Sequence, residues 1–123
     1  MAAKILIVDD SRTIRQLVGT VLLQAGFLVV EAEDGLQGVS TIDAQRDIDL
    51  VICDINMPNM NGIEMLTAVK ANPRNAALPV VMLTTEGSAD LIQQAKRLGA
   101  KGWVVKPFKP DQLVAAIRKI AGK

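Results

Sequence analysis

Short apolar runs alternate along the chain with stretches in which apolar residues recur every three or four positions. An uninterrupted apolar run is typical of a buried strand, whereas the longer spacing is typical of an amphipathic helix. The pattern predicts strands at residues 4–8, 28–31, 50–54, 79–84 and 102–106. It predicts helices through residues 14–25, 36–42, 63–69, 91–98 and 110–120.

Residues at the ends of these segments support the same boundaries. Ser11 and Ser88 stand where they can cap the first and fourth helices, and Pro110 stands where it can open the last. Gly26 and Gly99 follow helical stretches, where a glycine commonly ends a helix in the left-handed conformation. No linker or change of composition interrupts the series, so we expect one domain over residues 1–123.

Five strand–helix units of this kind predict an α/β fold with a parallel sheet covered by helices on both faces. In such a sheet the carboxyl ends of the strands lie along one edge, where ligands bind. The polar residues that this arrangement brings to that edge are Asp9, Asp10, Asp54, Thr84 and Lys106.

Three carboxylates at one edge repel each other, because two like charges ~4 Å apart cost about 4 kcal/mol at an effective dielectric near 20. A bound cation would relieve this cost, and an oxygen-only donor set favours Mg²⁺. Together with a lysine and a hydroxyl, the set describes a phosphoryl-transfer site with a carboxylate nucleophile. The alternative for Asp54 by itself is that it only begins a turn.

Several classes of site are excluded by composition. The chain has no histidine, and its single cysteine, Cys53, lies inside an apolar run and is predicted to be a buried hydrophobe. The turn after the first strand contains no glycine, so neither a dinucleotide fingerprint nor a Walker A loop is present. No apolar run approaches the ~18 residues of a membrane span, and we expect a cytoplasmic protein without membrane insertion.

The chain resembles the receiver domain of two-component response regulators, and among these the single-domain, CheY-like chemotaxis regulators. The resemblance covers essentially the whole chain, and its motifs are Val8-Asp9-Asp10, Asp54 with Met57-Pro58 and Gly62, Leu83-Thr84, and Lys106-Pro107-Phe108. It implies a doubly wound (βα)5 fold of the flavodoxin type, a three-layer sandwich with strand order 2-1-3-4-5. It also implies a cis peptide bond between Lys106 and Pro107, which X–Pro bonds tolerate at low cost.

The resemblance implies a role for each residue at this edge. Asp54 would accept a phosphoryl group from a histidine kinase or a small phosphodonor. Mg²⁺ would be bound by Asp10, Asp54 and the backbone carbonyl of Asn56, with Asp9 acting through water, and Lys106 would contact a phosphoryl oxygen. The protein would then be a switch rather than an enzyme, catalysing only its own phosphorylation and dephosphorylation.

Thr84 and Trp103 would form the coupled switch of the family. The family usually has tyrosine or phenylalanine where this chain has Trp103, and the larger indole is harder to fit into an inward pocket. The alternative is that Trp103 only packs on the surface.

Charge is distributed unevenly along the chain. Residues 1–95 carry six basic and twelve acidic residues, whereas residues 96–123 carry eight basic and one acidic. A solvated helix face and a surface for an acidic partner are both consistent with this asymmetry. The candidate partner surface comprises Lys96, Lys101, Trp103, Lys109, Arg118 and Lys119. We expect a monomer that binds a protein such as a flagellar motor switch component, and no nucleic acid.

Asn56 and Glu86 are predicted to flank the water that hydrolyses an aspartyl phosphate, and the resemblance implies rapid decay of the signal. A relay intermediate or phosphate sink would use the same residues. A more remote alternative is a phosphatase of the haloacid-dehalogenase type, but such enzymes place an aspartate as general acid two residues after the nucleophile, where this chain has Asn56.

Overall fold

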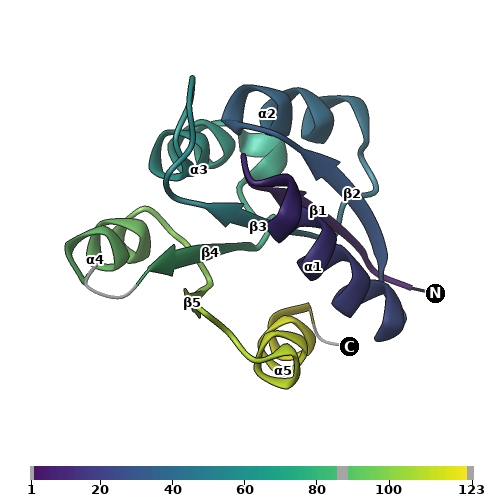
Figure 1. The fold of residues 1–123 in the computed structure, drawn as a ribbon. Helices are drawn as coiled ribbons and strands as arrows, with labels where there is room; N and C mark the ends of the chain where they lie inside the picture. The colour runs from purple at the N-terminus through teal and green to yellow at the C-terminus, as the bar shows by residue number, and fades with distance from the viewer. Residues whose placement is uncertain (1, 86–88, 122–123) are drawn as a thin grey trace.

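The computed structural model describes residues 2–85 and 89–121, in which helices and strands alternate as predicted (Figure 1). The strands are β1 (Lys4–Val8), β2 (Leu28–Ala32), β3 (Leu50–Asp54), β4 (Val80–Thr85) and β5 (Gly102–Lys106). The α-helices are α1 (Arg12–Gln24), α2 (Gly35–Ala44), α3 (Gly62–Ala71), α4 (Ala89–Arg97) and α5 (Pro110–Ala121), and a short 3-10 turn, η1 (Pro73–Asn75), follows α3. The turn η1 was not predicted.

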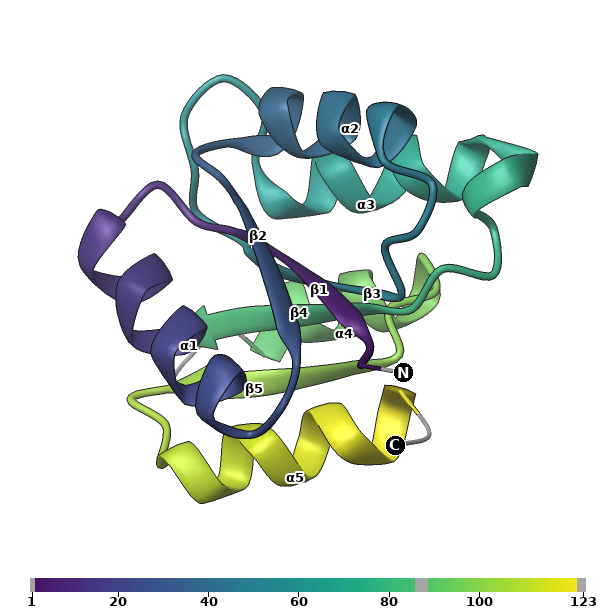
Figure 2. The ribbon, with the colours of Figure 1, turned by 90° about the vertical axis from the view of Figure 1, so that its right-hand side faces the viewer.

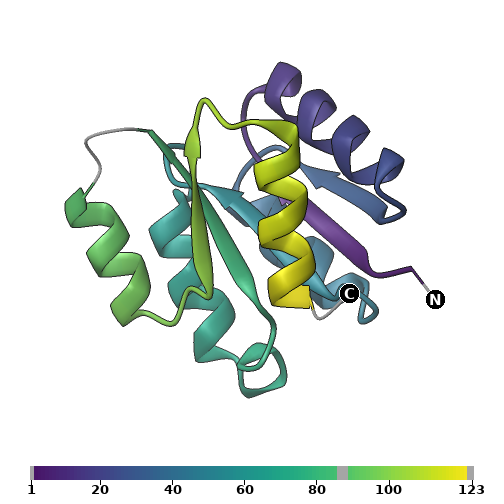
Figure 3. The same ribbon diagram turned by 90° about the horizontal axis from the view of Figure 1, so that it is seen from below.

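The strands form one parallel sheet in the order β2-β1-β3-β4-β5, which confirms the predicted fold. Alternate residues of the central strands face opposite sides, so the sheet has two hydrophobic cores. Leu6, Val51 and Met82 pack beneath α2, α3 and α4, and Ile7, Ile52 and Val81 pack beneath α1 and α5. Figure 2 shows α2 and α3 on one face and α1 and α5 on the other, and Figure 3 shows α4 and α5 on either side of β4 and β5.

Several helix boundaries arise from local hydrogen bonding. The side chain of Ser11 accepts a hydrogen bond from the backbone N–H of Ile14, as predicted for the cap of α1. Gly26 and Gly99 have φ of 97° and 102°, the left-handed conformation expected after a helix. The predicted cap Ser88 lies outside the described residues.

Helix α1 does not bury the whole apolar stripe that its sequence suggested. The spacing of Ile14, Leu17 and Val21 predicts that Leu17 faces inward, but Leu17 is 48% exposed. Arg15 is buried instead, on the same face as Val18 and Leu22. The buried face of α1 is therefore formed by Arg15, Val18, Gly19 and Leu22 rather than by the whole apolar stripe. Among the described residues, no helix is long and apolar enough to cross a bilayer.

The topology creates the site. Strands β1 and β3 are neighbours, but the chain leaves β1 toward one face and β3 toward the other, where α1 and α3 follow. The loops therefore diverge above the carboxyl ends of these two strands, and this point of a doubly wound sheet is where ligands bind.

Candidate functional site

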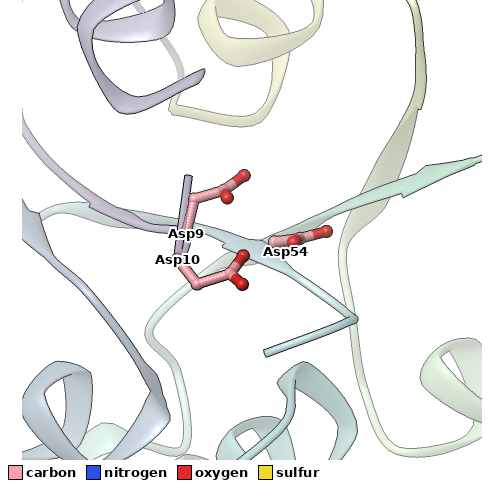
Figure 4. Close-up of side chains that lie close together, drawn as sticks. All are labelled: Asp9, Asp10 and Asp54. Carbon is pink, nitrogen blue, oxygen red and sulfur yellow. The ribbon is translucent and has the colours of Figure 1, made fainter. Parts of the chain in front are cut away.

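Three carboxylates meet above β1 and β3. Asp9 and Asp10 follow the last residue of β1, Asp54 is the last residue of β3, and each offers an oxygen within 4.8 Å of the others (Figure 4). Asp9 and Asp54 are 0% and 6% exposed, whereas Asp10 is exposed. The cluster predicted from the sequence is thus present, with two of its three charges removed from water.

Lys106 is the cation that the structure places beside this cluster. Its Nζ lies 3.2 Å from Asp9 Oδ2 and 3.2 Å from Asp54 Oδ1. Burial by itself would lower the pKa of Lys106, but the charges of Asp54 and Asp9, together with hydrogen bonds to both, raise it above its usual value. The lysine therefore remains charged, as required of a group that binds an anion.

The surroundings of Asp54 disfavour the charged form of its carboxyl group. Burial raises its pKa and the charge of Asp9 raises it further, while Lys106 acts in the opposite direction. One ammonium group thus only partly balances the charge of three carboxylates, and a divalent cation at the cluster would complete the balance.

Cys53, the residue before Asp54, is buried, and that burial raises the pKa of its thiol, which agrees with its predicted role as a hydrophobe.

The loop after Asp54 is fixed from two directions. The side-chain amide of Asn59 donates a 2.9 Å hydrogen bond to Asp34, and the backbone N–H of Gly35 donates to the Met60 carbonyl. Gly62 approaches β3 so closely that a Cβ there would collide with the Asp54 carbonyl oxygen. Asn56, in this loop, is exposed.

Comparison with known proteins assigns the family. The sequence model of the response regulator receiver domain matches residues 5–118. The chain belongs to the receiver-domain family. It is 42% identical over 118 residues to the chemotaxis protein CheY of Pseudomonas aeruginosa, covering 95% of this chain and 94% of that protein. It is 37% identical over 120 residues to the chemotaxis protein CheY1 of Helicobacter pylori strain J99, covering 97% of each.

Solved structures give the same result. The solved structure of the chemotaxis response regulator CheY4 of Vibrio cholerae superimposes with a TM-score of 0.91 at 41% identity, covering 98% of this chain and 99% of that one. The receiver domain of NtrX from Brucella abortus gives a TM-score of 0.90 at 31% identity, covering 97% and 98%. As a receiver domain, the chain is a signalling module of two-component systems.

Receiver domains bind Mg²⁺ in an acidic pocket, and the donor set here suits that ion. All three side chains offer carboxylate oxygens, and these lie close enough together to hold one ion. Asp10 is exposed, so the site is open to solvent and can admit the water molecules that Mg²⁺ usually keeps. No histidine or thiolate is available to select a softer metal. The residues present therefore fit the ion.

The two predicted switch residues of this receiver domain lie on β4 and β5. Thr84 is 2% exposed at the end of β4 and pairs in register with Val105. Trp103, which pairs with Met82, is 40% exposed. The indole of Trp103 thus lies outward in this structure, on the same strand as Lys106. Glu86, predicted to act in dephosphorylation, lies outside the described residues.

The six residues of the candidate partner surface are all exposed on α4, β5, α5 and their connections. Lys101, Trp103 and Lys119 line a hollow of about 280 Å³ between β5 and α5, which Val81 and Ile120 also line.

The peptide bond between Lys106 and Pro107 is cis, which confirms the cis bond expected from the sequence.

Two features near the site were not predicted. Arg15 is buried near Asp9. The helical period could have predicted this burial, because positions 15, 18 and 22 share one face of a helix. Asn61 and Glu64 form a capping box that begins α3 directly after the site loop. Its signature, an asparagine followed three residues later by a glutamate, was visible in the sequence.

Proposed function

We propose that this receiver domain is a phosphorylation-controlled switch whose phosphoryl acceptor is Asp54. The observation that carries the proposal is the position of the Asp54 carboxylate at the open end of β3, 3.2 Å from Lys106 and beside Asp9 and Asp10. The donor is the phosphohistidine of a histidine kinase, or a small phosphodonor.

In the transfer step an Asp54 oxygen attacks phosphorus. The new O–P bond forms as the P–N bond of phosphohistidine breaks, and the electron pair of that bond remains on the imidazole nitrogen. Asp10, Asp54 and the Asn56 carbonyl would hold Mg²⁺, with Asp9 acting through water, and the bound ion would supply charge neutralisation for the phosphoryl oxygens. Lys106 favours the ionised, nucleophilic form of Asp54 and then binds a phosphoryl oxygen. Thr84 then moves toward the phosphoryl group, and the side chain of Trp103 moves with it.

We further propose that the output is protein binding in chemotaxis. The proteins from Pseudomonas aeruginosa and Helicobacter pylori described above are named chemotaxis proteins and match this chain over nearly its whole length. The basic surface around Lys101 and Lys119 is the candidate contact for an acidic segment, such as one on a motor switch component. A relay role remains the second candidate, since it requires the same chemistry without this surface.

The experiment is phosphorylation by acetyl phosphate or phosphoramidate in Mg²⁺, followed by intact-protein mass spectrometry. The wild type is expected to gain one acid-stable, hydroxylamine-labile phosphoryl group, and Asp54→Asn is expected to gain none. Asp43→Asn removes a charge from an exposed position on α2 and should behave as the wild type. Modification of Asp54→Asn at the wild-type rate would refute the assignment.

A further inference from the structure

Arg15 is the only arginine that is buried in the part of the chain that the structure describes; it is 8% exposed. Arginine is rarely buried unless its donors are paired, because desolvating a guanidinium without partners is costly. Arg15 also interrupts an inward face of α1 otherwise formed by Val18, Gly19 and Leu22. An apolar residue would pack there more cheaply, so the guanidinium has a more specific role.

Its hydrogen bonds indicate what that role is. Nη1 donates a 2.6 Å hydrogen bond to the backbone carbonyl of Asp9, and Nε donates a 3.1 Å hydrogen bond to Oε1 of Glu31 on β2. Arg15 therefore connects the first residue after β1 to the edge strand of the sheet. Lysine could not replace it, because two donors separated by the planar guanidinium contact two different partners at once.

Asp9 is consequently held at each of its polar groups. Its N–H donates to the Ala32 carbonyl, and its carbonyl accepts from Arg15. One carboxylate oxygen accepts a 2.8 Å hydrogen bond from the N–H of Ser11, and the other accepts from Lys106. The contacts of the backbone of Asp9 thus set the direction of its side chain, and they also set where Asp10, the next residue, leaves the strand.

We infer that Arg15 is a positioning residue for the acidic cluster, with Glu31 as its anchor on β2. By holding the Asp9 carbonyl, the Arg15–Glu31 pair keeps the turn between β1 and α1 in the conformation that places Asp9 and Asp10 beside Asp54. The inference rests on the proposed function in one respect, that the cluster binds a divalent cation. It extends the proposal to two residues that lie outside the set of metal ligands.

The quantity that separates positioning from simple packing is metal affinity measured on folded protein. Outer-shell partners of metal ligands typically contribute about 10–100-fold to affinity. Arg15 contacts the backbone of a ligand-bearing residue rather than the ligand atom, so we expect Mg²⁺ to bind Arg15→Met about tenfold more weakly than wild type, at the lower end of that range. Arg15→Lys keeps the charge but not both contacts, and should recover only part of the affinity.

The test is titration of each variant with Mg²⁺ by calorimetry, at a temperature where circular dichroism in EDTA shows it folded. Arg12→Met is the matched control, because Arg12 is an exposed arginine on the same helix, and its affinity should equal that of wild type. Unchanged affinity of Arg15→Met, with only its melting temperature lowered, would assign Arg15 a packing role and overturn the inference.

Glu31→Met provides a second route should Arg15→Met not fold, since half of the Glu31 side chain is exposed and its loss leaves the core intact. We expect it to weaken Mg²⁺ binding several-fold, and wild-type affinity in this variant would overturn the inference. If wild type itself binds no Mg²⁺, the metal proposal and this inference both fail. Binding by wild type with unchanged variants refutes the inference alone.

Discussion

Lys106 Nζ lies 3.2 Å from Oδ2 of Asp9, a residue 97 positions earlier in the chain. The same nitrogen is 3.2 Å from Asp54 Oδ1, so one lysine at the end of β5 reaches across the end of β4 to a carboxylate on β3 and to one directly after β1. This contact joins three strands at one point, and it is the only cationic contact with the cluster among the ion pairs of the described residues.

Replacing Lys106 with methionine should therefore destabilise the metal-free protein and increase its response to Mg²⁺. The change removes the one cation that the two buried carboxylates share, at a cost of about 2 kcal/mol. Since Mg²⁺ binding to the native state relieves the same repulsion, the rise in melting temperature on adding the ion should be larger than in wild type. Thermal melts in EDTA and in Mg²⁺ measure both effects.

Lys109→Met is the control for that experiment, because Lys109 is exposed and its replacement should change stability by no more than about 0.5 kcal/mol. A smaller Mg²⁺ response in Lys106→Met than in wild type would contradict the proposed sharing of charge.

Asp34 should make stability depend on pH. Its side chain accepts hydrogen bonds from the backbone N–H of Gln37 and from the amide of Asn59, and these, the Gln37 bond foremost, lower its pKa. A carboxyl group whose pKa is lower in the folded state stabilises the protein above its unfolded pKa of about 3.9, and this contribution is lost as pH falls through the folded value.

The variant Asp34→Asn keeps an acceptor for the cap of α2 but cannot titrate. Its unfolding free energy, measured in urea, should fall below that of wild type at neutral pH, and the difference should shrink as the pH falls below the unfolded pKa of about 3.9. Other titrating groups are common to both proteins and cancel. A difference that is constant with pH would show that the charge of Asp34 does not contribute.

Trp103 should report on the acidic cluster. It is the only tryptophan, it is 40% exposed, and it shares β5 with Lys106. If phosphorylation draws the indole inward, a phosphoryl mimic such as beryllium fluoride with Mg²⁺ should shift its emission to shorter wavelength. Asp54→Asn should show no such shift, and an unchanged wild-type spectrum at saturation would leave Trp103 as a packing residue.

The lifetime of the phosphoryl group should depend on Asn56 and Glu86. Hydrolysis needs a water held in line with the O–P bond, and misplacing reacting groups can cost up to ~100-fold in rate. Asn56→Met and Glu86→Leu are each expected to slow decay at saturating Mg²⁺ by roughly tenfold. Asn75→Met is the control, because η1 precedes β4 and so lies at the amino ends of the strands, away from the cluster. Decay as fast as in wild type would remove the chemical basis for a transient signal.

Reversing the charge of Lys101 and Lys119 should impair partner binding and leave phosphorylation intact. The phosphorylated double variant, with both replaced by glutamate, should bind an acidic helical peptide about tenfold more weakly, which corresponds to ~1.4 kcal/mol. Its binding should also depend less on salt. Arg46→Glu with Arg74→Glu makes the same reversal elsewhere on the surface. Loss of phosphorylation with binding preserved would show that the partner surface lies elsewhere.

The sequence by itself determined the elements and the edge at which the site forms. Strands buried on both faces are apolar over most of their length, so β1, β3 and β4 are recognisable without their neighbours. Parallel strands present their carboxyl ends together, which is why Asp9, Asp54 and Lys106 could be assigned to one cluster before any contact was known. The cap Ser11 depends only on residues within the next turn of helix.

Only the tertiary structure decided which face of α1 is buried. Apolar spacing placed Leu17 inward, but the contact of Arg15 with the Asp9 carbonyl and with Glu31 needs β2 and the end of β1 in place, and this packing leaves Leu17 exposed. The link between Asn59 and Asp34 likewise joins two loops 25 positions apart. Hydrogen bonds of this kind join side chains whose separation depends on the packing of whole elements, and local propensity carries no information about that distance.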